Sequence, residues 1–499
     1  MSDTVTALQK ALAPKTGMQR IPFTTESYRH DSLPLSSKLL MNLMAEAAPA
    51  DARTPIVLIP TAGLGVALPF ALGDGPVRAL NTEYPGFIYA VSGSRFYRVT
   101  VVGGGVVVQD LGDVGIPTGP YNFTLMVTIA VSTIAVVVVV PPNAFTCAHG
   151  DLAVNQIGGT FPEGGAGSVT FFQGYFVFNN ATAGTTFFIS RLEDPNDYDA
   201  LDFASLEAFS TDLVLTKRIG ANLWFIGRGG MEIWYNAGSS GLETTPGTSF
   251  FPFRRMAGGI LEHGTEAPRS VAVADDSLFW VGFDGIVYRT VGYRAKRVST
   301  HAIERIIRDN GVDQVMVSMS WAYQGHYYYA VTWASETLVY DIATDKWHNR
   351  SSNADGSGRW RPDCAAPGQA VPIFGDSLSG NLLSPVENLS TDVSVPLKRQ
   401  VITPPLWANT VRAFCARVEL EMECGGTFSP GDITLEWSDD GGRNWTGGPR
   451  VMNSGRSDET RKRVYTTRLG SFRQRMFRIT AAGWTTLYAL DAEITPGAT

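Results

Sequence analysis

The strongest constraint on the fold of this chain is a hairpin pattern that recurs along most of it. Short apolar or aromatic runs, each broken by a Gly, Asn or Asp turn, read as strand, tight turn and strand. From Tyr175 onward these runs start roughly 50 residues apart, a spacing typical of β-propeller blades. One four-stranded blade cannot bury both of its faces alone, whereas blades packed around an axis bury each other. The runs begin at Phe87, Tyr175, Leu223, Leu278, Tyr327 and Ile373.

This spacing predicts an all-β fold with a six- or seven-bladed β-propeller over residues 55–386. The wider gap between the first two runs contains a Val-rich hairpin, which we expect to form one further unit. The composition agrees, because 52 Gly, 28 Pro and only 17% charged residues are the balance of a turn-rich β protein.

The Val-rich segment, residues 123–140 (FTLMVTIAVSTIAVVVVV), is long enough to be weighed as a membrane span. Its residues are mostly Val, Ile and Thr, which favour strands, and it lacks flanking basic residues and aromatic anchors. We therefore expect two buried strands ending at Pro141-Pro142, with a membrane-penetrating loop as the alternative. No stable membrane insertion is predicted.

Helical spacing is confined to three short segments. Residues 4–12, with Val5, Leu8 and Leu12 on one face, and residues 35–48 predict a helical N-terminal arm over residues 1–54. A third helix is expected over residues 300–309, where a Ser or Thr cap precedes Glu304 and the segment interrupts the hairpin pattern as an insertion between blades.

The character of the chain changes after residue 386. Strand patterns continue, and residues 416–424 (ARVELEMEC) alternate acidic with apolar side chains, which is typical of a half-buried antiparallel sheet. The simplest architecture for this part is a β-sandwich over residues 387–499.

Charge and motif content argue against several function classes. The net charge is −7, whereas tight phosphate binding normally requires a basic excess. The four Cys lack CxxC spacing and the six His lack HxH or HxxxH spacing, so neither a metal site nor any cofactor is expected. The paired acids Asp275-Asp276 and Asp439-Asp440 adjoin turn signals, which favours solvated turns over acid–base chemistry. We expect no catalytic residues and no enzymatic activity.

The sharpest local motif is SDDGGRNW at residues 438–445, which fits the Asp-box pattern S-x-D-x-G-x-[TN]-W of sialidases and other propellers. In such a motif Ser438 and Asp440 hold a hairpin turn by local hydrogen bonds, Gly442 adopts a conformation that other residues avoid, and Trp445 packs beneath. It indicates a structural hairpin, with a ligand site as the alternative.

The arginine-rich C-terminal tract is the feature most open to function. It is compatible with a solvated strand face, with a subunit or partner interface, or with DNA contact, because the arginine fork suits carboxylates and phosphates equally. Glu419, Glu421 and Glu423 form an acidic ladder that is a candidate counterpart on a neighbouring subunit. The basic candidates are Arg461, Lys462, Arg463, Arg468, Arg473 and Arg475.

Several short tags occur along the chain in a characteristic order. They are SLPLS (32–36), NLMAE (42–46), PTAGL (60–64), EIWYN (232–236), FPF (251–253), APRSV (267–271), GIVYR (285–289), STHAIE (299–304), YD (340–341) leading to WH (347–348), WSDDGG (437–442) and RLGS (468–471). Together they resemble the podovirus packaged-DNA stabilisation proteins, the head-to-tail stopper or tail-hub family of P22-like phages. The N-terminal arm and the Val-rich hairpin depart from this pattern.

The resemblance implies a structural virion protein that plugs or extends the portal channel, retains packaged DNA and carries further tail components. The implied partners are other copies in a homo-oligomeric ring of six, the portal adaptor, and tail needle, nozzle, fibre or spike proteins. DNA would pass through the channel without sequence-specific contact. The implied location is the head–tail junction of the particle, after synthesis and assembly in the bacterial cytoplasm.

A different class of function remains open from the sequence. The Asp-box and the blade repeat also suit a propeller that binds or hydrolyses glycans, as in a phage tail depolymerase. Such a protein would need a carboxylate pair and an arginine cluster on the propeller axis.

Overall fold

The computed structural model of this chain divides into two units, each assembled from segments that lie far apart in the sequence. The propeller unit contains Val66–Trp333 and Arg361–Ser384, and the sandwich unit contains Met1–Gly65, Ala334–Trp360 and Pro385–Thr499. The structure describes residues 17–52, 54–73, 75–102, 105–116, 126–182, 184–238, 251–312, 316–408, 411–425, 433–446, 450–452 and 461–497.

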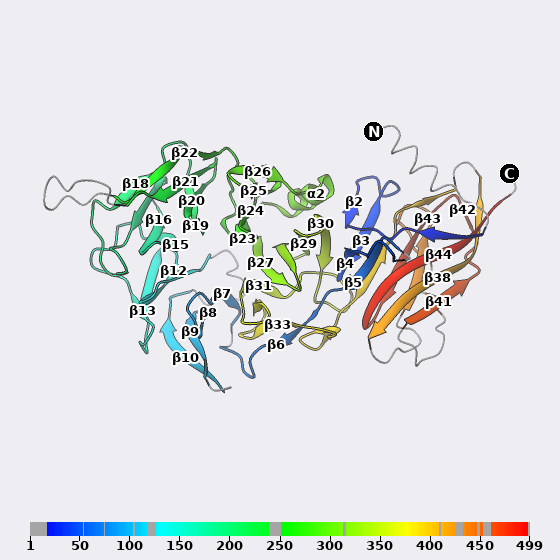
Figure 1. Ribbon diagram of the computed structural model, residues 1–499, viewed down its shortest axis with the longest axis horizontal. Coiled ribbons are helices and arrows are strands. Elements are labelled where there is room, and N and C mark those ends of the chain that lie inside the picture. The colour runs from blue at the N-terminus through cyan, green and yellow to red at the C-terminus, as the bar shows by residue number, and fades with distance from the viewer. Residues whose placement is uncertain are drawn as a thin grey trace. The chain divides into compact units, whose positions relative to one another are not determined.

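The propeller unit is built from antiparallel sheets whose strands follow one another along the chain (Figure 1). Five of its sheets have four strands each, and a hairpin and a three-stranded meander follow them. The four-stranded sheets are β7 (Val77–Asn81), β8 (Phe87–Ser92), β9 (Arg95–Val102), β10 (Gly105–Asp113); β11 (Thr128–Val131), β12 (Ala135–Val140), β13 (Asn143–Ala148), β14 (Asn155–Gln156); β15 (Ala166–Phe172), β16 (Tyr175–Asn180), β17 (Thr186–Ile189), β18 (Phe203–Ser205); β19 (Leu213–Ile219), β20 (Asn222–Gly227), β21 (Met231–Asn236), β22 (Phe253–Leu261); and β23 (Ala272–Ala274), β24 (Ser277–Val281), β25 (Val287–Val291), β26 (Arg294–Arg297). The hairpin is β27 (Val317–Tyr323) and β28 (His326–Thr332), and the meander is β31 (Pro362–Ala366), β32 (Ile373–Asp376) and β33 (Leu382–Val386).

The first strands of these sheets form the inner ring of the propeller. Strand β7 contacts β11, β11 contacts β15, and β15 contacts β19; further round, β23 contacts β27 and β27 contacts β31. The ring closes where β31 contacts β7. Leu382 of β33 belongs to the same buried cluster as Val77 and Val99 of the first sheet, so the last meander packs directly on the first blade.

The middle strands of the blades are buried on both faces, and this explains their uninterrupted apolar sequences. In β12, Val136 and Val138 pack in the cluster shared with the first blade, whereas Val137 and Val139 pack with β16 of the third sheet. Successive side chains of a strand point to opposite faces, so one strand serves two interfaces. The predicted buried strands of the Val-rich segment are confirmed as β11 and β12, and residues 123–125 lie outside the described residues.

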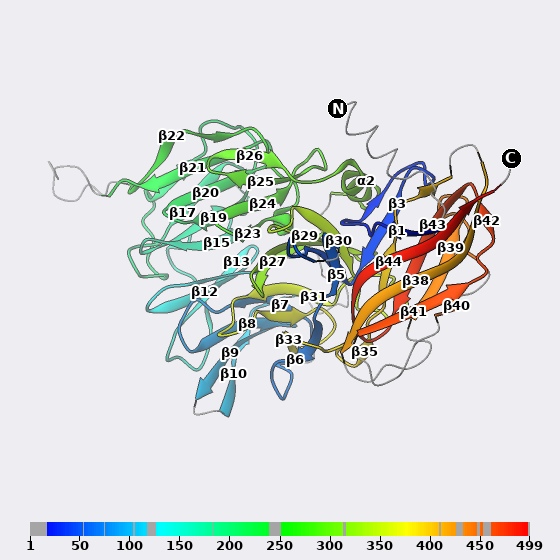
Figure 2. The same ribbon diagram turned by 45° about the vertical axis from the view of Figure 1, so that its right-hand side comes forward.

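The sandwich unit consists of two packed sheets (Figure 2). The first runs β4–β5–β44–β38–β41, with β1 on β44 and β42 on β38; the second runs, within this unit, β29–β30–β3–β36–β43–β39–β40, with β2 on β3 and β37 on β43. Leu58, Leu420 and Leu490 of the first sheet and Leu40 and Ile479 of the second share one buried core. The strands are β1 (Gly17–Ile21), β2 (Tyr28–Arg29), β3 (Ser37–Met41), β4 (Leu43–Ala47), β5 (Ile56–Pro60), β29 (Thr337–Asp341), β30 (Lys346–Arg350), β36 (Arg399–Ile402), β37 (Leu406–Trp407), β38 (Ala413–Gly425), β39 (Ile433–Ser438), β40 (Arg450–Val451), β41 (Arg461–Thr467), β42 (Ser471–Phe472), β43 (Gln474–Ala481) and β44 (Trp484–Pro496). The shorter β6 (Gly63–Val66), β34 (Thr391–Asp392) and β35 (Val395–Pro396) pair with one another, β34 with β6 and with β35.

The prediction of a helix over residues 35–48 is wrong, because this segment forms β3 and β4. Asn42 separates the two strands with a left-handed backbone (φ 52°), and its buried side chain donates to the carbonyl oxygens of Ser351 (3.0 Å) and Lys398 (2.9 Å). Its side-chain oxygen accepts from the Ser351 amide at 3.1 Å. These contacts with residues far along the chain override the local helical spacing. The other predicted arm helix, residues 4–12, lies outside the described residues.

The predicted insertion helix is confirmed as α2 (His301–Asn310), between β26 and β27. Thr300 is its N-cap, and the Thr300 hydroxyl accepts from the Ile303 amide. A short 3₁₀ turn, η1 (Pro268–Ser270), precedes β23. Among the described residues, no helix has the length and apolar character needed to cross a membrane.

The predicted fold class, an all-β chain with a β-propeller followed by a β-sandwich, is confirmed, whereas a helical N-terminal arm is not among the described elements. The described arm residues instead supply β1 to β4, which belong to the two sheets of the sandwich unit. The segment Ala334–Trp360 belongs to the same unit, although it precedes the last meander of the propeller in sequence.

We predict that Asn42→Ala lowers the free energy of unfolding by about 2–4 kcal/mol, because it leaves buried backbone groups of Ser351 and Lys398 without partners and places a Cβ-bearing apolar residue at φ > 0. Asn42→Gly loses the same hydrogen bonds but tolerates the backbone conformation, so its loss should be smaller by about 1 kcal/mol. Denaturant unfolding followed by tryptophan fluorescence measures both. Wild-type stability of the Ala variant would contradict this role for Asn42.

Candidate functional site: the charged face of the sandwich

The acidic ladder lies on the outer face of the first sandwich sheet. Strand β38 alternates as predicted: Val418, Leu420 and Met422 are fully buried in the core, and the intervening glutamates point the other way. Burial on this outer face is uneven, because the side chain of Glu421 is only 5% exposed while Glu423 is open to solvent. The ladder is therefore part of a structured surface.

Part of the arginine-rich tract pairs with the ladder inside one chain. In the β38–β41 register Glu423 lies opposite Arg461 and Glu421 lies opposite Arg463. The Arg461 guanidinium donates to the Glu421 carboxylate (Nε to Oε1, 2.9 Å), and Arg463 Nη1 lies 3.8 Å from Glu419 Oε1. Strands β38, β41 and β44 run side by side in this sheet (Figure 2). Pairing of the ladder with a neighbouring subunit stays a prediction.

The charged face continues across the sheet as an alternation of charges. Arg417 donates to Glu419 at 2.7 Å and its guanidinium lies 4.4 Å from the Tyr465 ring centroid. On the next strands Arg20 of β1 donates to Asp491 of β44 at 2.6 Å. No local motif marks Arg20 or Asp491, because their pairing depends on strand register, whereas Arg417 and Glu419 lie two residues apart on one strand.

A groove of about 550 Å³ opens at one end of the charged face. A β-bulge between β38 and β44 leaves Tyr488 unpaired in the register, and its hydroxyl donates to the Glu423 carboxylate. Burial, reinforced by this carboxylate, raises the pKa of Tyr488 to about 12. The groove is lined by Glu46, Ala47, Ala48, Pro49, Ala52, Thr54, Val57, Ile59, Glu421, Glu423, Arg461, Tyr488 and Ala489.

The predicted Asp-box has the expected hairpin geometry. The Ser438 hydroxyl donates to Asp440 Oδ1 at 2.7 Å and accepts from the Gly442 amide at 2.8 Å. Asp440 also accepts from the amides of Arg443 (3.0 Å) and Asn444 (2.9 Å). Desolvation acts to raise the pKa of Asp440, but the hydrogen bonds outweigh it and hold that pKa at about 2.

The two glycines of this turn also bring the N-terminal segment close. Gly441 (φ 77°) and Gly442 (φ 90°) have left-handed backbones, and a Cβ on Gly441 would lie 2.4 Å from the Cα of Pro34. The Ser37 hydroxyl donates to the Gly441 carbonyl at 3.1 Å. Trp445 lies half-buried beneath the Arg478 guanidinium, 4.2 Å from the ring centroid. The Asp-box therefore joins the N-terminal and C-terminal segments of the sandwich unit.

The remaining basic candidates divide into buried and exposed residues. Arg475 is 1% exposed and makes a bidentate ion pair with Asp439, with both N–O distances 2.7 Å. Lys462 is also buried, because it lies on the face of β41 that is turned away from solvent. Arg468 (φ 62°) and Arg473 are exposed in the segment around β42. The structure thus brings Arg461 and Arg463 to the charged face and gives Arg475 a place within the fold.

The chain is an all-β protein in which a β-propeller is joined to a β-sandwich with a charged outer face. The family described as Bacteriophage P22 Gp10, beta-propeller, matches residues 19–384, and the family described as Bacteriophage P22 Gp10, beta-sandwich, matches residues 398–495. The chain belongs to the bacteriophage P22 Gp10 family, and it is a phage structural protein of the head–tail region.

Other comparisons add little to this assignment. No curated protein sequence matches the chain. Among solved structures, the N-terminal domain of Nup159 is similar with a TM-score of 0.39 and 10% identity, covering 70% of this chain and 99% of that one. BamB from Moraxella catarrhalis has a TM-score of 0.37 and 11% identity, covering 74% and 100%. Likeness at this level carries no conclusion about function.

We predict that the stability contributed by Asp440 depends on pH. Its pKa is lower in the folded chain than its ordinary 3.8, so its hydrogen bonds stabilise the fold fully above about pH 4 and are lost as the pH falls towards 2. The difference in unfolding free energy between wild type and Asp440→Asn should be about 1–2 kcal/mol at neutral pH and shrink over that window. A difference that is constant from pH 5 to pH 2 would contradict this prediction.

The ion pair between Arg461 and Glu421 should respond unequally to loss of its two members. Arg461→Gln leaves the buried carboxylate of Glu421 without its cation and should cost about 1–3 kcal/mol of unfolding free energy. Glu421→Gln leaves an arginine that is 66% exposed to solvent and should cost under about 1 kcal/mol. Thermal unfolding of the two variants compares these losses, and a larger loss for Glu421→Gln would contradict the assignment.

Proposed function

We propose that this chain is a connector at the head–tail junction of a tailed phage, where it plugs or extends the portal channel, retains the packaged DNA and carries distal tail components. In this proposal it acts as a ring of about six copies, the number that the resemblance to the family implies, in contact with the portal adaptor on one side and with tail needle, nozzle, fibre or spike proteins on the other. It performs these tasks by assembly and not by catalysis.

The observation that carries the proposal is the match of the P22 Gp10 family to both units of the chain. The net charge of −7 supports it, because a channel wall without a basic excess does not hold phosphates and allows DNA to leave quickly. The pairing of exposed charges on the sandwich face supports it as well, since such a lattice provides specific, complementary contacts for neighbouring proteins.

The glycan-binding alternative gains no support from the position of the Asp-box. Ser438 and Asp440 belong to the turn that follows β39, in the sandwich unit, and their side-chain hydrogen bonds hold this turn, while Gly441 and Asp439 tie it to Ser37 and Arg475 of the same unit. We therefore keep the Asp-box as a structural hairpin, and we draw no activity from it.

The decisive experiment uses particles that lack this chain. Heads produced without it should package DNA and then lose it, and supplying the purified protein should restore heads that keep their DNA. DNase protection and electron microscopy of the heads measure retention. Heads that stay full without the chain would contradict the stopper role, and hydrolysis of host glycans by the purified chain would contradict the absence of catalysis.

A further inference from the structure

A strip of cations lies on the outer rim of the fifth sheet of the propeller unit. Residues 289–309 contain six Arg or Lys and two acids, Glu304 and Asp309, in a chain whose net charge is −7. Strand β26 is the edge strand of its sheet, and Arg294 and Lys296 are exposed on it with no ion pair within the described part of the chain. We define the basic rim as Arg294, Lys296, Arg297, Arg305 and Arg308.

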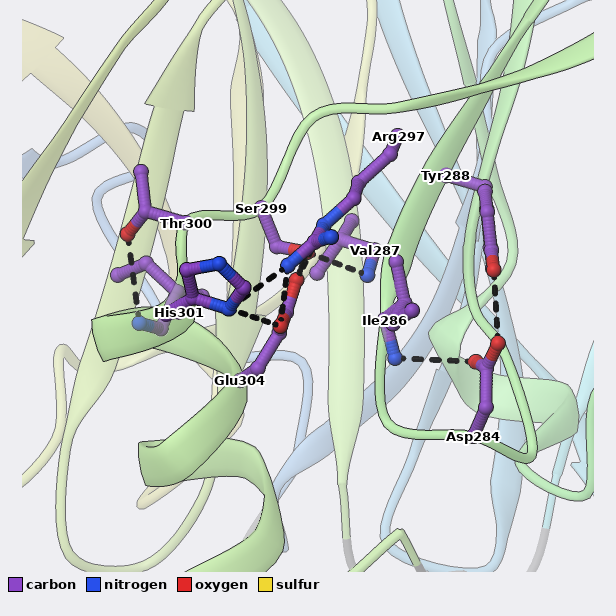
Figure 3. Close-up of polar contacts among 10 residues, drawn as sticks. Asp284, Ile286, Val287, Tyr288, Arg297, Ser299, Thr300, His301 and Glu304 are labelled. Atoms are coloured by element: carbon purple, nitrogen blue, oxygen red, sulfur yellow. Dashed lines mark hydrogen bonds and ion pairs between the residues drawn. The ribbon is translucent and has the colours of Figure 1, made fainter.

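Glu304 fixes the helical half of the basic rim to the strand half. Its carboxylate accepts from Arg297 (2.7 and 2.6 Å) and from the Ser299 hydroxyl (2.7 Å), and the Ser299 hydroxyl in turn accepts from the Val287 amide at 3.0 Å. Figure 3 shows Glu304 pointing from the first turn of α2 towards Arg297 and Ser299. Glu304 is therefore used internally, and Arg308 lies 3.7 Å from the carboxylate of the adjacent Asp309, so Arg294 and Lys296 are the exposed cations that the rim offers to a partner.

A loop of opposite character lies on the third sheet of the same unit. Residues 191–202 (RLEDPNDYDALD), which we call the acidic loop, contain five acids and one arginine. Leu192 and Leu201 are 63% and 74% exposed, so apolar side chains stand out among the acids. The basic rim offers matching apolar surface, because Val291 and Tyr293 beside it are 55% and 46% exposed.

The acidic loop and the β25–β26 turn, where the basic rim begins, occupy equivalent positions in their sheets. The acidic loop joins β17 to β18, and the turn at Tyr293 joins β25 to β26, so each connects the third and fourth strands of its sheet. Both connections lie next to the outermost strand of their sheets, with the sheet β19–β22 between them in chain order. In sequence order the two surfaces are two blades apart.

We propose that the basic rim of one copy binds the acidic loop of the next copy and that this contact forms the ring. The inference rests on the proposed connector function and names its subunit interface. A contact between two different patches of identical chains is heterologous, and repetition of it closes a ring when the angle allows. Positions two blades apart on a disc of six or seven blades subtend about 100–120°, which closes a planar ring at about five or six copies.

Another interpretation of the basic rim is protection of an edge strand from unwanted pairing, for which lysine and arginine on the edge suffice. That interpretation requires no counterpart elsewhere on the chain and no sequence specificity. Binding of DNA phosphates is the other competitor, and it would not involve the acidic loop. The docking of two copies differs from both interpretations, because it predicts that ring assembly requires the basic rim and the acidic loop together.

The test is an exchange of charges between the two surfaces. R294E/K296E reverses the basic rim, and E193K/D197K reverses the acidic loop; each should reduce ring formation of the purified full chain at least tenfold in apparent dissociation constant, measured by sedimentation velocity at low salt. The variant with all four changes should form rings again. A mixture of the two reversed variants should also assemble, because each supplies the surface that the other lacks.

The matched control is R228E/R254E, which removes two exposed propeller cations away from the basic rim and should leave assembly unchanged. Thermal unfolding of every variant separates loss of contact from loss of fold. Rings formed normally by R294E/K296E, failure of the fourfold variant to recover, or a wild-type chain that stays monomeric at low salt would overturn the inference. Any of these results leaves the connector function intact, since that function is judged by DNA retention in particles.

Discussion

The propeller unit depends on one constraint, the burial of both faces of each middle strand. Val136 and Val138 of β12 pack towards the first blade while Val137 and Val139 pack towards the third sheet. In β20 the same alternation sends Phe225 to one neighbour and Trp224 to the other. Since every blade supplies half of two interfaces, no blade is stable without its neighbours, and the ring must close for the first and last of them to be covered.

The blades of the propeller can be predicted from the sequence, because the two patterns that determine them are local. Alternation along a strand and Gly or Asn at a turn lie within a few residues of each other, so the blade repeat, the buried Val-rich strands and the helix α2 were predictable. The helix expected over residues 35–48 failed because its outcome is decided by Asn42 and its partners at Ser351 and Lys398, which lie hundreds of positions away in sequence. No local sequence pattern indicates a contact between residues so far apart in the chain.

The candidate site was predictable to the same extent. The Asp-box turn is a local motif, and its hydrogen bonds follow the expected scheme. The alternation of β38 correctly placed its glutamates on one face, but only strand register shows that Arg461 and Arg463 oppose them within the same chain. Arg475 was grouped with the exposed arginines, although its pairing with Asp439 buries it. The basic rim went unnoticed because its cations are divided between a strand and a helix.

The chain passes between its two units at four places, after Gly65, Trp333, Trp360 and Ser384. In a protein with one linker between its domains, a pulling force passes through a single stretch of backbone. In this chain four stretches of backbone connect the two units. A force that pulls the two units apart is therefore divided among these connections.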